Sequence, residues 1–465
     1  MKRKKWGNYM KSYELQPTYE NLLDSIVQDT IGRNNDIYMF AEIINTLDGP
    51  WSIAVDGKWG SGKTFFVKQT KLFIDAQNEF VNYIDENDKN SIKSICRNDS
   101  IEWQAQVSIY YDAWENDNDS DPVLSLIYSI ISNINTDFTM SESDGCFKKA
   151  ASLLEFFTGK NWKSVVDSFK GDNPLDEIRK NKDIENKIKD FLDSLLVERG
   201  NRLIVFVDEL DRCKPSYAVN LLERIKHYFC NDRITFVFSI NGRELQHTIR
   251  RYYGEDFDAC RYLDRFFDLR ITLPPANRSM FYESINFNNH YYTYDIVCNA
   301  VIENYDLQLR EMAKYIRLAK IAAYKPTHAD RRLDFVFPEE KAEEICLLYI
   351  VPVMIGLKIY STDIYDKFVF GKDCTPLIEV INRLNCRYFS DFLNPDETFS
   401  EKEKDKKLVT PEDKWKQIYD ALFVTVYSGS HYQTEIGNYI FNSGTKNILL
   451  RTVSLLSKYT SLDIM

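Results

Sequence analysis

Apolar residues in the first 275 positions alternate between short continuous runs and longer stretches with helical spacing. Five short segments predict strands: 51–55, 106–111, 203–207, 234–240 and 267–273. Five longer segments predict helices: 37–47, 64–75, 123–134, 215–229 and 245–253. Continuous apolar runs are typical of strands buried on both faces. The alternation therefore predicts an α/β fold, a parallel sheet flanked by helices.

The pattern changes after residue 275, where strand signals stop. We expect an N-terminal arm at 1–28, an α/β core at 29–275 and a mostly α-helical C-terminal domain at 276–465. The polar stretch 84–104 predicts a loop. Residues 139–200, with helices at 147–170 and 175–199, are the other expected inserted material. The apolar run 346–357 is shorter than the ~20 residues of a membrane-spanning helix, so we expect it to form a buried helix.

A glycine-rich segment follows the first predicted strand and precedes a predicted helix. It reads Gly57-Lys58-Trp59-Gly60-Ser61-Gly62-Lys63-Thr64, followed by Phe65. Glycines let backbone N–H groups turn toward phosphates, and a helix N-terminus adds partial positive charge. In such a P-loop, Lys63 reaches the β- and γ-phosphates and Thr64 ligates magnesium. Residues 57–65 are therefore expected to bind a nucleoside triphosphate, with ATP and Mg²⁺ as the expected pair and GTP left open.

Two carboxylates end the buried run at 203–207. Asp208 is expected to hold magnesium, and Glu209 to orient or deprotonate the attacking water. The alternative is a helix cap after a core strand, but a P-loop in the same chain favours catalysis. Asn241 follows the next strand and is expected either to touch the γ-phosphate or to form a turn before Gly242.

The composition bears on possible partners and on the cellular compartment. The net charge is −11, so the chain as a whole does not attract nucleic acid or an anionic membrane. Nine cysteines without a CxxC pair predict reduced thiols in a cytoplasmic protein, and the five histidines are too scattered to suggest a metal site. The basic N-terminus lacks the apolar region of a signal peptide.

Four stretches together resemble the KAP family of P-loop NTPases. The most specific is Val205-Phe206-Val207-Asp208-Glu209-Leu210-Asp211-Arg212-Cys213, which resembles the family's extended Walker B signature. The others are Asp29-Thr30-Ile31-Gly32-Arg33, Tyr111-Asp112-Ala113-Trp114, and the closing segment 253–274. The resemblance covers roughly residues 29–320.

The resemblance implies an ASCE-type ATPase core related to the STAND and AAA+ groups. Such proteins often form homo-oligomers in which arginines complete a neighbour's site. Arg212 and Arg265 are candidates for that role, with structural salt bridges as the alternative. The segment beginning Leu309-Arg310 resembles the start of the family's helical lid, so Arg310 is a candidate sensor of the γ-phosphate.

The chain departs from the family pattern in three places. Many members carry transmembrane helices between the two Walker motifs, whereas the insert here is polar and no transmembrane segment is expected. Glu209 stands where Asp is more usual, which preserves the chemistry. Asn241 stands where Asp is frequent.

Two further segments have a functional and a structural interpretation. Residues 313–332 hold six basic residues against one acid, which suggests a nucleic-acid patch but favours a solvated helix face. Residues 281–294 hold six aromatic residues, which favour core packing over a partner surface.

Three functions are compatible with these motifs. The leading one is an ATPase that acts as a switch or motor in a multi-protein assembly with partner proteins. The second is a nucleotide-gated oligomeric module with little hydrolysis, and the third is an ATPase acting on nucleic acid. The resemblance also suggests a bacterial role in anti-phage defence or in organising membrane-proximal complexes, but a shared fold does not fix function.

Overall fold

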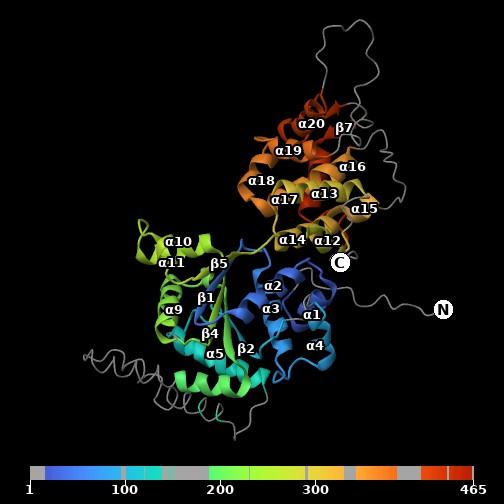
Figure 1. Cartoon of the computed structure of the whole chain (residues 1–465). Coiled ribbons are helices and arrows are strands. Elements are labelled where there is room, and N and C mark those ends of the chain that lie inside the picture. Colours follow the sequence, from blue (N-terminus) through green and yellow to red (C-terminus); the bar gives the residue numbers. More distant parts are fainter. Residues whose placement is uncertain are drawn as a thin grey trace, which may run out of the picture. The chain divides into compact units, whose positions relative to one another are not determined.

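The computed structural model describes residues 16–95, 101–119, 121–138, 145, 149, 188–229, 231–287, 292–328, 342–384, 410–436 and 439–462. The chain divides into two compact units, residues 16–280 and the described part of 281–465 (Figure 1). The helices expected at 147–170 and 175–199 lie largely outside the described residues, although residues 188–199 are helical.

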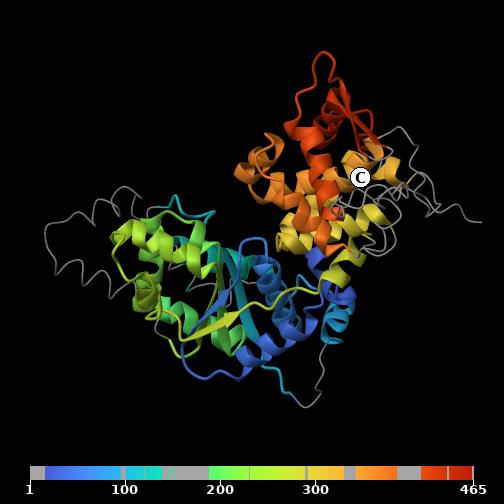
Figure 2. The same ribbon diagram turned by 90° about the horizontal axis from the view of Figure 1, so that it is seen from above.

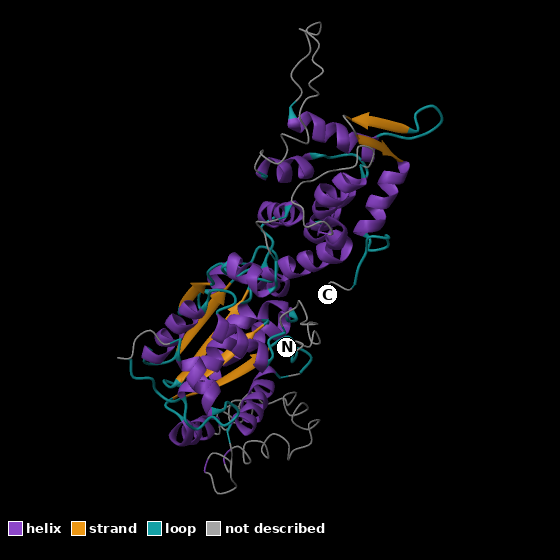
Figure 3. Cartoon of the chain, turned by 90° about the vertical axis from the view of Figure 1, so that its right-hand side faces the viewer, coloured by secondary structure: helices purple, strands orange, loops and turns teal. Residues whose placement is uncertain are grey.

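The first unit is built on a five-stranded parallel sheet (Figure 3). Its strands are β1 (Trp51–Asp56), β2 (Gln106–Asp112), β3 (Arg202–Asp208), β4 (Ile234–Ile240) and β5 (Leu269–Thr272). Their spatial order is β2-β3-β4-β1-β5. Every residue of β3 and β4 is buried, as their apolar runs predict. The expected α/β fold is thus confirmed, with β4 between β1 and β3.

Helices cover both faces of this sheet. From β1 to β2 the chain crosses the sheet in one direction, and from β2 to β5 it returns in the other. Right-handed crossovers therefore place α3 (Lys63–Gln77) on one face, and α5 (Pro122–Asp137), α9 (Pro215–Tyr228) and α10 (Gly242–Tyr253) on the other (Figure 1). Two helices, α1 (Tyr19–Gln28) and α2 (Asn34–Thr46), pack against α3. The short α11 (Ala259–Leu263) precedes β5.

The strand register brings the carboxyl ends of the strands together. Asp112 of β2 lies beside Asp208 of β3, which lies beside Ser239 of β4. Asp56 of β1 lies beside Ile240 of β4. Residues that follow these strands consequently emerge at one edge of the sheet, where ligands bind in open α/β folds.

The loop expected at 84–104 is partly wrong, because it contains helix α4 (Glu86–Lys93). The Asp85 side chain caps this helix by accepting a hydrogen bond from the Asp88 backbone N–H at 2.9 Å. Ile92 is its one fully buried apolar side chain, so the sequence carries almost no helical periodicity. A hydrogen bond from the Tyr19 hydroxyl to Asp88 (2.6 Å) ties α4 to α1.

The second unit is mainly helical, as expected (yellow to red in Figure 2). Its helices are α12 (Arg278–Ser284, which begins in the first unit), α13 (Thr293–Asn304), α14 (Leu309–Ala319), α15 (Lys325–His328), α16 (Glu343–Ile345), α17 (Val351–Tyr360), α18 (Thr362–Val369), α19 (Thr375–Arg383), α20 (Pro411–Tyr419) and α21 (Ser443–Val453). Helices α13 and α17 pack so closely that a Cβ at Gly356 would overlap Val301.

This unit also contains a small hairpin and a long buried apolar segment. An antiparallel hairpin of β6 (Gln433–Ile436) and β7 (Tyr439–Asn442) lies where only helices were expected. The apolar run 346–357 is helical and fully buried, as predicted. Within the described ranges, no helix is long and apolar enough to cross a membrane.

Candidate functional site

The glycine-rich loop connects β1 directly to α3. Gly60 (φ 78°) and Gly62 (φ 90°) adopt left-handed backbone conformations that residues with side chains rarely adopt. Gly62 stands at the N-cap of α3, and no side chain caps the first amides of this helix. The backbone N–H groups of this end are thus left for an anion.

Two further observations describe the inside of this loop. A Cβ at Gly57 would lie 2.9 Å from the Ser61 hydroxyl and 3.3 Å from Lys63 Cγ, so the loop is tightly folded. The Ser61 hydroxyl is buried and has no hydrogen-bond partner among the described residues. A buried polar group without a partner costs free energy that a ligand oxygen can recover.

The Lys63 side chain folds back along the loop. Its ammonium donates hydrogen bonds to the carbonyl oxygens of Gly57 (2.7 Å) and Lys58 (3.2 Å) and is largely buried. Burial lowers the pKa of Lys63, while Asp211, Asp208, Glu209 and Asp56 act to raise it. The ammonium therefore lies in a strongly acidic environment at the carboxyl ends of β1 and β3.

Asp208 ends β3 and is 1% exposed. One carboxylate oxygen accepts a hydrogen bond from the Tyr110 hydroxyl (3.0 Å), and the other accepts one from the Glu209 backbone N–H (2.9 Å). These two bonds fix the carboxylate at the edge of the sheet. Within the described ranges, no group of three His, Cys, Asp or Glu side chains could hold a metal ion. Thr64 and Asp208 therefore stay the predicted ligands of Mg²⁺, which would need phosphate oxygens as further ligands.

Glu209 leaves the strand in a left-handed backbone conformation (φ 58°). Its carboxylate forms an ion pair with Arg212, with 2.6 Å between Arg212 Nε and Glu209 Oε2. Burial and the neighbouring charge of Asp208 raise the pKa of Glu209 to about 7, and Arg212 opposes this rise. A carboxyl with a raised pKa beside a second carboxylate is a candidate for proton transfer.

Arg212 lies in the site of its own chain. Its guanidinium is 5.8 Å from the ring centroid of Trp59 in the P-loop and 5.5 Å from that of Trp114 after β2. Both distances are within the range of cation–π attraction. Both indole rings are about half exposed, at 45% for Trp59 and 51% for Trp114. Arg212 thus forms the intramolecular salt bridge that the sequence left as its alternative role.

Asp211 is a site residue that the sequence analysis did not single out. It is 5% exposed, and its carboxylate accepts hydrogen bonds from the Trp59 indole N–H (2.5 Å) and the Asn241 backbone N–H (3.1 Å). Burial raises its pKa, and these two hydrogen bonds oppose the rise. The sequence did offer one indication of its role, because Asp211 is the third acidic residue of the segment 205–213.

Asn241 lies beside this cluster, but its side chain caps α10. The amide oxygen accepts a hydrogen bond from the Glu244 backbone N–H at 3.4 Å, a long bond. The Asn241 backbone N–H is held by Asp211. Of its two expected roles, the turn before Gly242 matches these contacts, and contact with the γ-phosphate stays a prediction.

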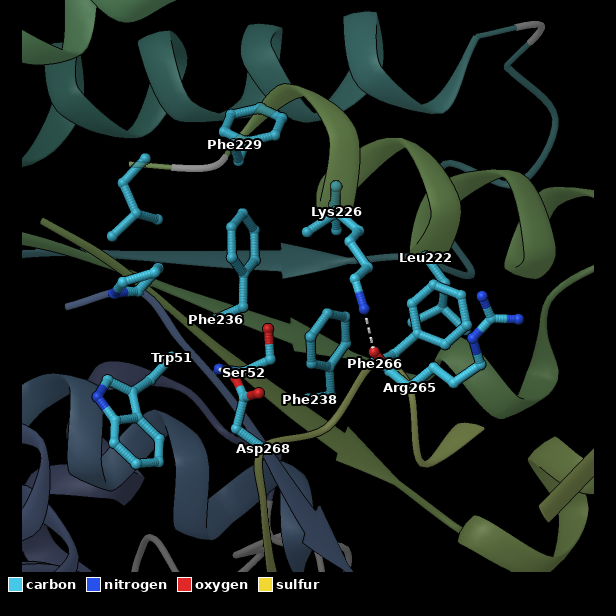
Figure 4. Close-up of a pocket in the computed structure, with 13 residues that line it drawn as sticks. Trp51, Ser52, Leu222, Lys226, Phe229, Phe236, Phe238, Arg265, Phe266 and Asp268 are labelled. Atoms are coloured by element: carbon cyan, nitrogen blue, oxygen red, sulfur yellow. Dashed lines mark hydrogen bonds between the residues drawn. The ribbon is translucent and has the colours of Figure 1, made fainter. Parts of the chain in front are cut away.

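Arg265 lies away from the P-loop. It lines a hollow of about 190 Å³ together with residues that lead into β1 and the end of α9 (Figure 4). The Lys226 ammonium donates a hydrogen bond to the Arg265 backbone oxygen, while the Arg265 side chain is exposed. The hollow includes Trp51 and Ser52 at the amino end of β1, whereas the P-loop follows the carboxyl end of that strand.

The remaining candidates belong to the second unit. Arg310 is exposed at the start of α14. In the basic segment, Lys314, Arg317 and Lys325 are exposed, whereas Lys320 is buried and donates hydrogen bonds to the Ile285 and Asn286 backbone oxygens. Including Lys320 in a basic surface was therefore wrong. Residues 331 and 332 lie outside the described ranges.

The aromatic segment 281–294 packs mainly into the core, as preferred. Four of its aromatic side chains are buried: Phe281, Tyr282, Phe287 and Tyr294. Tyr292 is half-buried, and residue 291 lies outside the described ranges.

A parallel sheet, a P-loop at the N-terminus of α3 and a carboxylate pair after β3 define a nucleotide-binding P-loop NTPase domain. The family model of the KAP family P-loop domain matches residues 33–287, more than half of the chain. The chain therefore belongs to the KAP family of P-loop NTPases.

Other similarities are shorter or more distant. The chain is 40% identical over 67 residues to an uncharacterized protein of Methanocaldococcus jannaschii, a match that covers 14% of this chain and about a third (34%) of that protein. Among solved structures, it is similar to the Aeropyrum pernix ORC2 protein in its ADPNP and ADP complexes, with 13% identity, 72% and 78% of the two chains covered and a TM-score of 0.33. C. elegans PCH-2 is also similar, with 11% identity, 78% and 68% covered and a TM-score of 0.19.

Proposed function

We propose that this chain binds ATP with Mg²⁺ and hydrolyses it, and that hydrolysis switches or drives an assembly. Lys63 and the amides of the P-loop bind the β- and γ-phosphates. Thr64 and Asp208 hold Mg²⁺, which supplies charge neutralisation at the phosphates. Glu209 accepts a proton from the attacking water as the water oxygen bonds to the γ-phosphorus and the bond to the β-phosphate oxygen breaks.

One observation supports this proposal most strongly. The Lys63 ammonium lies among Asp56, Asp208, Glu209 and Asp211, at the point where the loop after β1 meets the end of β3. These residues are up to 155 positions apart in the chain (211 − 56). Their convergence brings together the phosphate-binding cation, the magnesium ligand and the base that phosphoryl transfer to water requires.

Phosphate release by the purified full chain tests the proposal. We expect release with ATP and Mg²⁺, and none above background when EDTA removes the metal. Lack of release in the presence of Mg²⁺, by a chain that binds ATP, would overturn the hydrolysis proposal.

The ion pair between Glu209 and Arg212 favours a second candidate, a nucleotide-gated module with little hydrolysis. A carboxylate already held by a guanidinium is less available to accept a proton from water. This function predicts an ATP-dependent change in molar mass without phosphate release. Light scattering with ATP and with ADP, beside the phosphate assay, separates the two functions.

Self-association is part of the proposal and is supported by the position of Arg265. This arginine is exposed and lies near the amino end of β1, whereas its own P-loop lies at the carboxyl end. Six residues of strand separate these ends, about 17 Å at 3.3 Å per residue step. A neighbour that docks head to tail would bring Arg265 toward the next copy's nucleotide. Arg310 is the proposed γ-phosphate sensor within the lid.

Two further roles are proposed, nucleic-acid binding and anti-phage defence. Nucleic-acid binding draws only on Lys314, Arg317 and Lys325 as exposed cations of the described basic segment, and a filter-binding assay without salt-sensitive affinity would remove it. A role in anti-phage defence rests on the family resemblance. Plaque counts on cells that express the wild type or the Glu209→Gln variant test it, with equal counts opposing the role.

A further inference from the structure

Asp211 occupies a central position in the short 3-10 turn Leu210–Arg212 that follows Glu209. Its side chain joins two segments that are distant in the sequence. One carboxylate oxygen accepts the Trp59 indole N–H (2.5 Å) from the P-loop, and the other accepts the Asn241 backbone N–H (3.1 Å) from the end of β4. The Asp211 backbone oxygen accepts a further bond from the Thr248 hydroxyl of α10 (3.3 Å).

Trp59 has a second contact with the same turn. Its ring lies 5.8 Å from the guanidinium of Arg212, and Arg212 binds the Glu209 carboxylate at 2.6 Å. A chain of contacts thus runs from the P-loop through Trp59 to Arg212 and Glu209. Asp211 binds the indole N–H at the start of this chain of contacts.

We propose that Asp211 is a positioning residue that couples the conformation of the P-loop to the position of the Glu209 carboxylate through Trp59. This inference goes beyond the proposed hydrolysis and rests on it. The P-loop holds the phosphates, so Trp59 moves with the loop when nucleotide enters. Because Asp211 and Arg212 both contact the indole, a movement of Trp59 shifts the Arg212 guanidinium. The Glu209 carboxylate, which is paired with Arg212, then shifts with it.

The chemistry of Asp211 offers a specific test. Both partners of its carboxylate are N–H donors, so the carboxylate must accept at both oxygens. Asp211→Asn puts an NH₂ group, also a donor, against one of them. Trp59→Phe keeps an aromatic ring near Arg212 but removes the N–H donor. If the two residues act together, both variants break the same link.

The experiment compares Asp211→Asn, Trp59→Phe and the double variant in the full chain. We expect each single variant to lower kcat about tenfold, the effect of one lost charge-assisted hydrogen bond, and to leave the Kd for a fluorescent ADP within about twofold. The double variant is expected to match the singles. Additive losses, or a loss of affinity at unchanged kcat, would overturn the coupling. Trp51→Phe is the matched control, since that indole N–H binds the Asp48 backbone oxygen (2.8 Å) at the other end of β1.

A second readout does not depend on turnover. The difference in emission between the wild type and Trp59→Phe isolates the Trp59 signal, and we expect it to shift on addition of a non-hydrolysable ATP analogue. Asp211→Asn should change the size of this shift while analogue binding persists, because part of the shift comes from the contact between the indole N–H and the Asp211 carboxylate. A shift of unchanged size in Asp211→Asn would overturn the proposal. If the wild type binds the analogue but releases no phosphate, the hydrolysis proposal fails and this readout still decides the coupling of Trp59 to Asp211. Because Trp59 is about half exposed, Trp59→Phe is expected to fold, and its kcat tests the proposal if Asp211→Asn does not fold.

Discussion

At the scale of single residues, the site depends on one cation among several acids. Lys63 is largely buried, and its ammonium is bonded to two carbonyl oxygens of its own loop. Asp208 and Glu209 adjoin each other at the end of β3, and Arg212 already binds Glu209. These carboxylates would repel the phosphates of a nucleotide. Lys63, the P-loop amides and Mg²⁺ are therefore needed to balance their negative charge.

Lys63→Ala is expected to abolish most triphosphate binding. It removes the ammonium and leaves its phosphate partners without a charge-assisted bond, so the Kd for ATP should rise about 10- to 100-fold. Anisotropy of a fluorescent ATP analogue measures the change. Lys93→Ala, an exposed lysine on α4, is the control and should keep wild-type affinity. Equal affinity of the two variants would contradict the role of Lys63.

The residues of the P-loop and of the carboxylate pair were predictable because each motif is a short continuous stretch of sequence. Gly57 to Thr64 and Asp208-Glu209 each occupy a few consecutive positions. The bond between Trp59 and Asp211 was not predictable, because it joins positions 152 residues apart and depends on which strands are neighbours. The contacts of Arg212 with Trp59 and Trp114 were hidden for the same reason.

At the scale of elements, the P-loop depends on left-handed glycines. Gly62→Ala is expected to raise the free energy of the native loop by about 1–2 kcal/mol, the cost of a side chain in that backbone region. It should also weaken ATP binding, because Gly62 is the N-cap of α3, whose first backbone amides are proposed to bind phosphate. Calorimetric titration with ATP and chemical unfolding measure the two effects.

Gly49→Ala is the matched control for that variant. Gly49 has a similar backbone angle (φ 82°) and open space around its Cβ position, but it precedes β1. We expect a comparable loss of stability with unchanged ATP affinity. A similar loss of affinity in both variants would show that strain, and not the site, explains the result.

A buried polar network attaches α3 to the rest of the sheet unit. Asp75 accepts hydrogen bonds from Lys71 (2.7 Å), Tyr83 (2.6 Å) and Ser108 (2.5 Å), and its side chain is 2% exposed. Asp75→Asn should lower the free energy of unfolding by roughly 3 kcal/mol, because it breaks a buried ion pair. Urea unfolding measures this loss. Asp264→Asn, which breaks an exposed pair with Arg270, should change stability by less than about 1 kcal/mol, and equal losses would count against the network.

Strong hydrophobic patterns made most elements predictable. The apolar run of β3 is unbroken from residue 203 to residue 207, and β4 is interrupted only by the small residues Thr235 and Ser239. Helix α4 was missed because Ile92 is its single apolar residue, so no helical periodicity is visible, although Asp85 offered a cap. The hairpin of β6 and β7 was missed because its strands have four residues each and are mostly half-buried, so neither alternation nor a continuous run is visible.

At the scale of the whole molecule, the position of Arg265 leads to a test of self-association. A Glu209→Gln copy lacks the base in its own site but can offer Arg265 to a neighbour's site. An Arg265→Ala copy keeps the base in its own site but offers no arginine to its neighbour. Each variant alone should release little phosphate, and a mixture should recover activity if a neighbour's arginine completes the site. A mixture of Glu209→Gln with Lys63→Ala is the control and should stay inactive, because neither copy has a complete site. No recovery in the first mixture would contradict an action of Arg265 between copies.

If this KAP family chain hydrolyses ATP with Glu209 as the base, the Glu209→Gln variant should bind ATP but not turn it over. ATP binding and phosphate release of Glu209→Gln are measured beside those of the wild type. We expect this variant to bind ATP with wild-type affinity and to release phosphate at least about 100-fold more slowly, within the contribution of a general base. Glu86→Gln, an exposed carboxylate on α4, should match the wild type in both assays. Unchanged phosphate release by Glu209→Gln would contradict the claim.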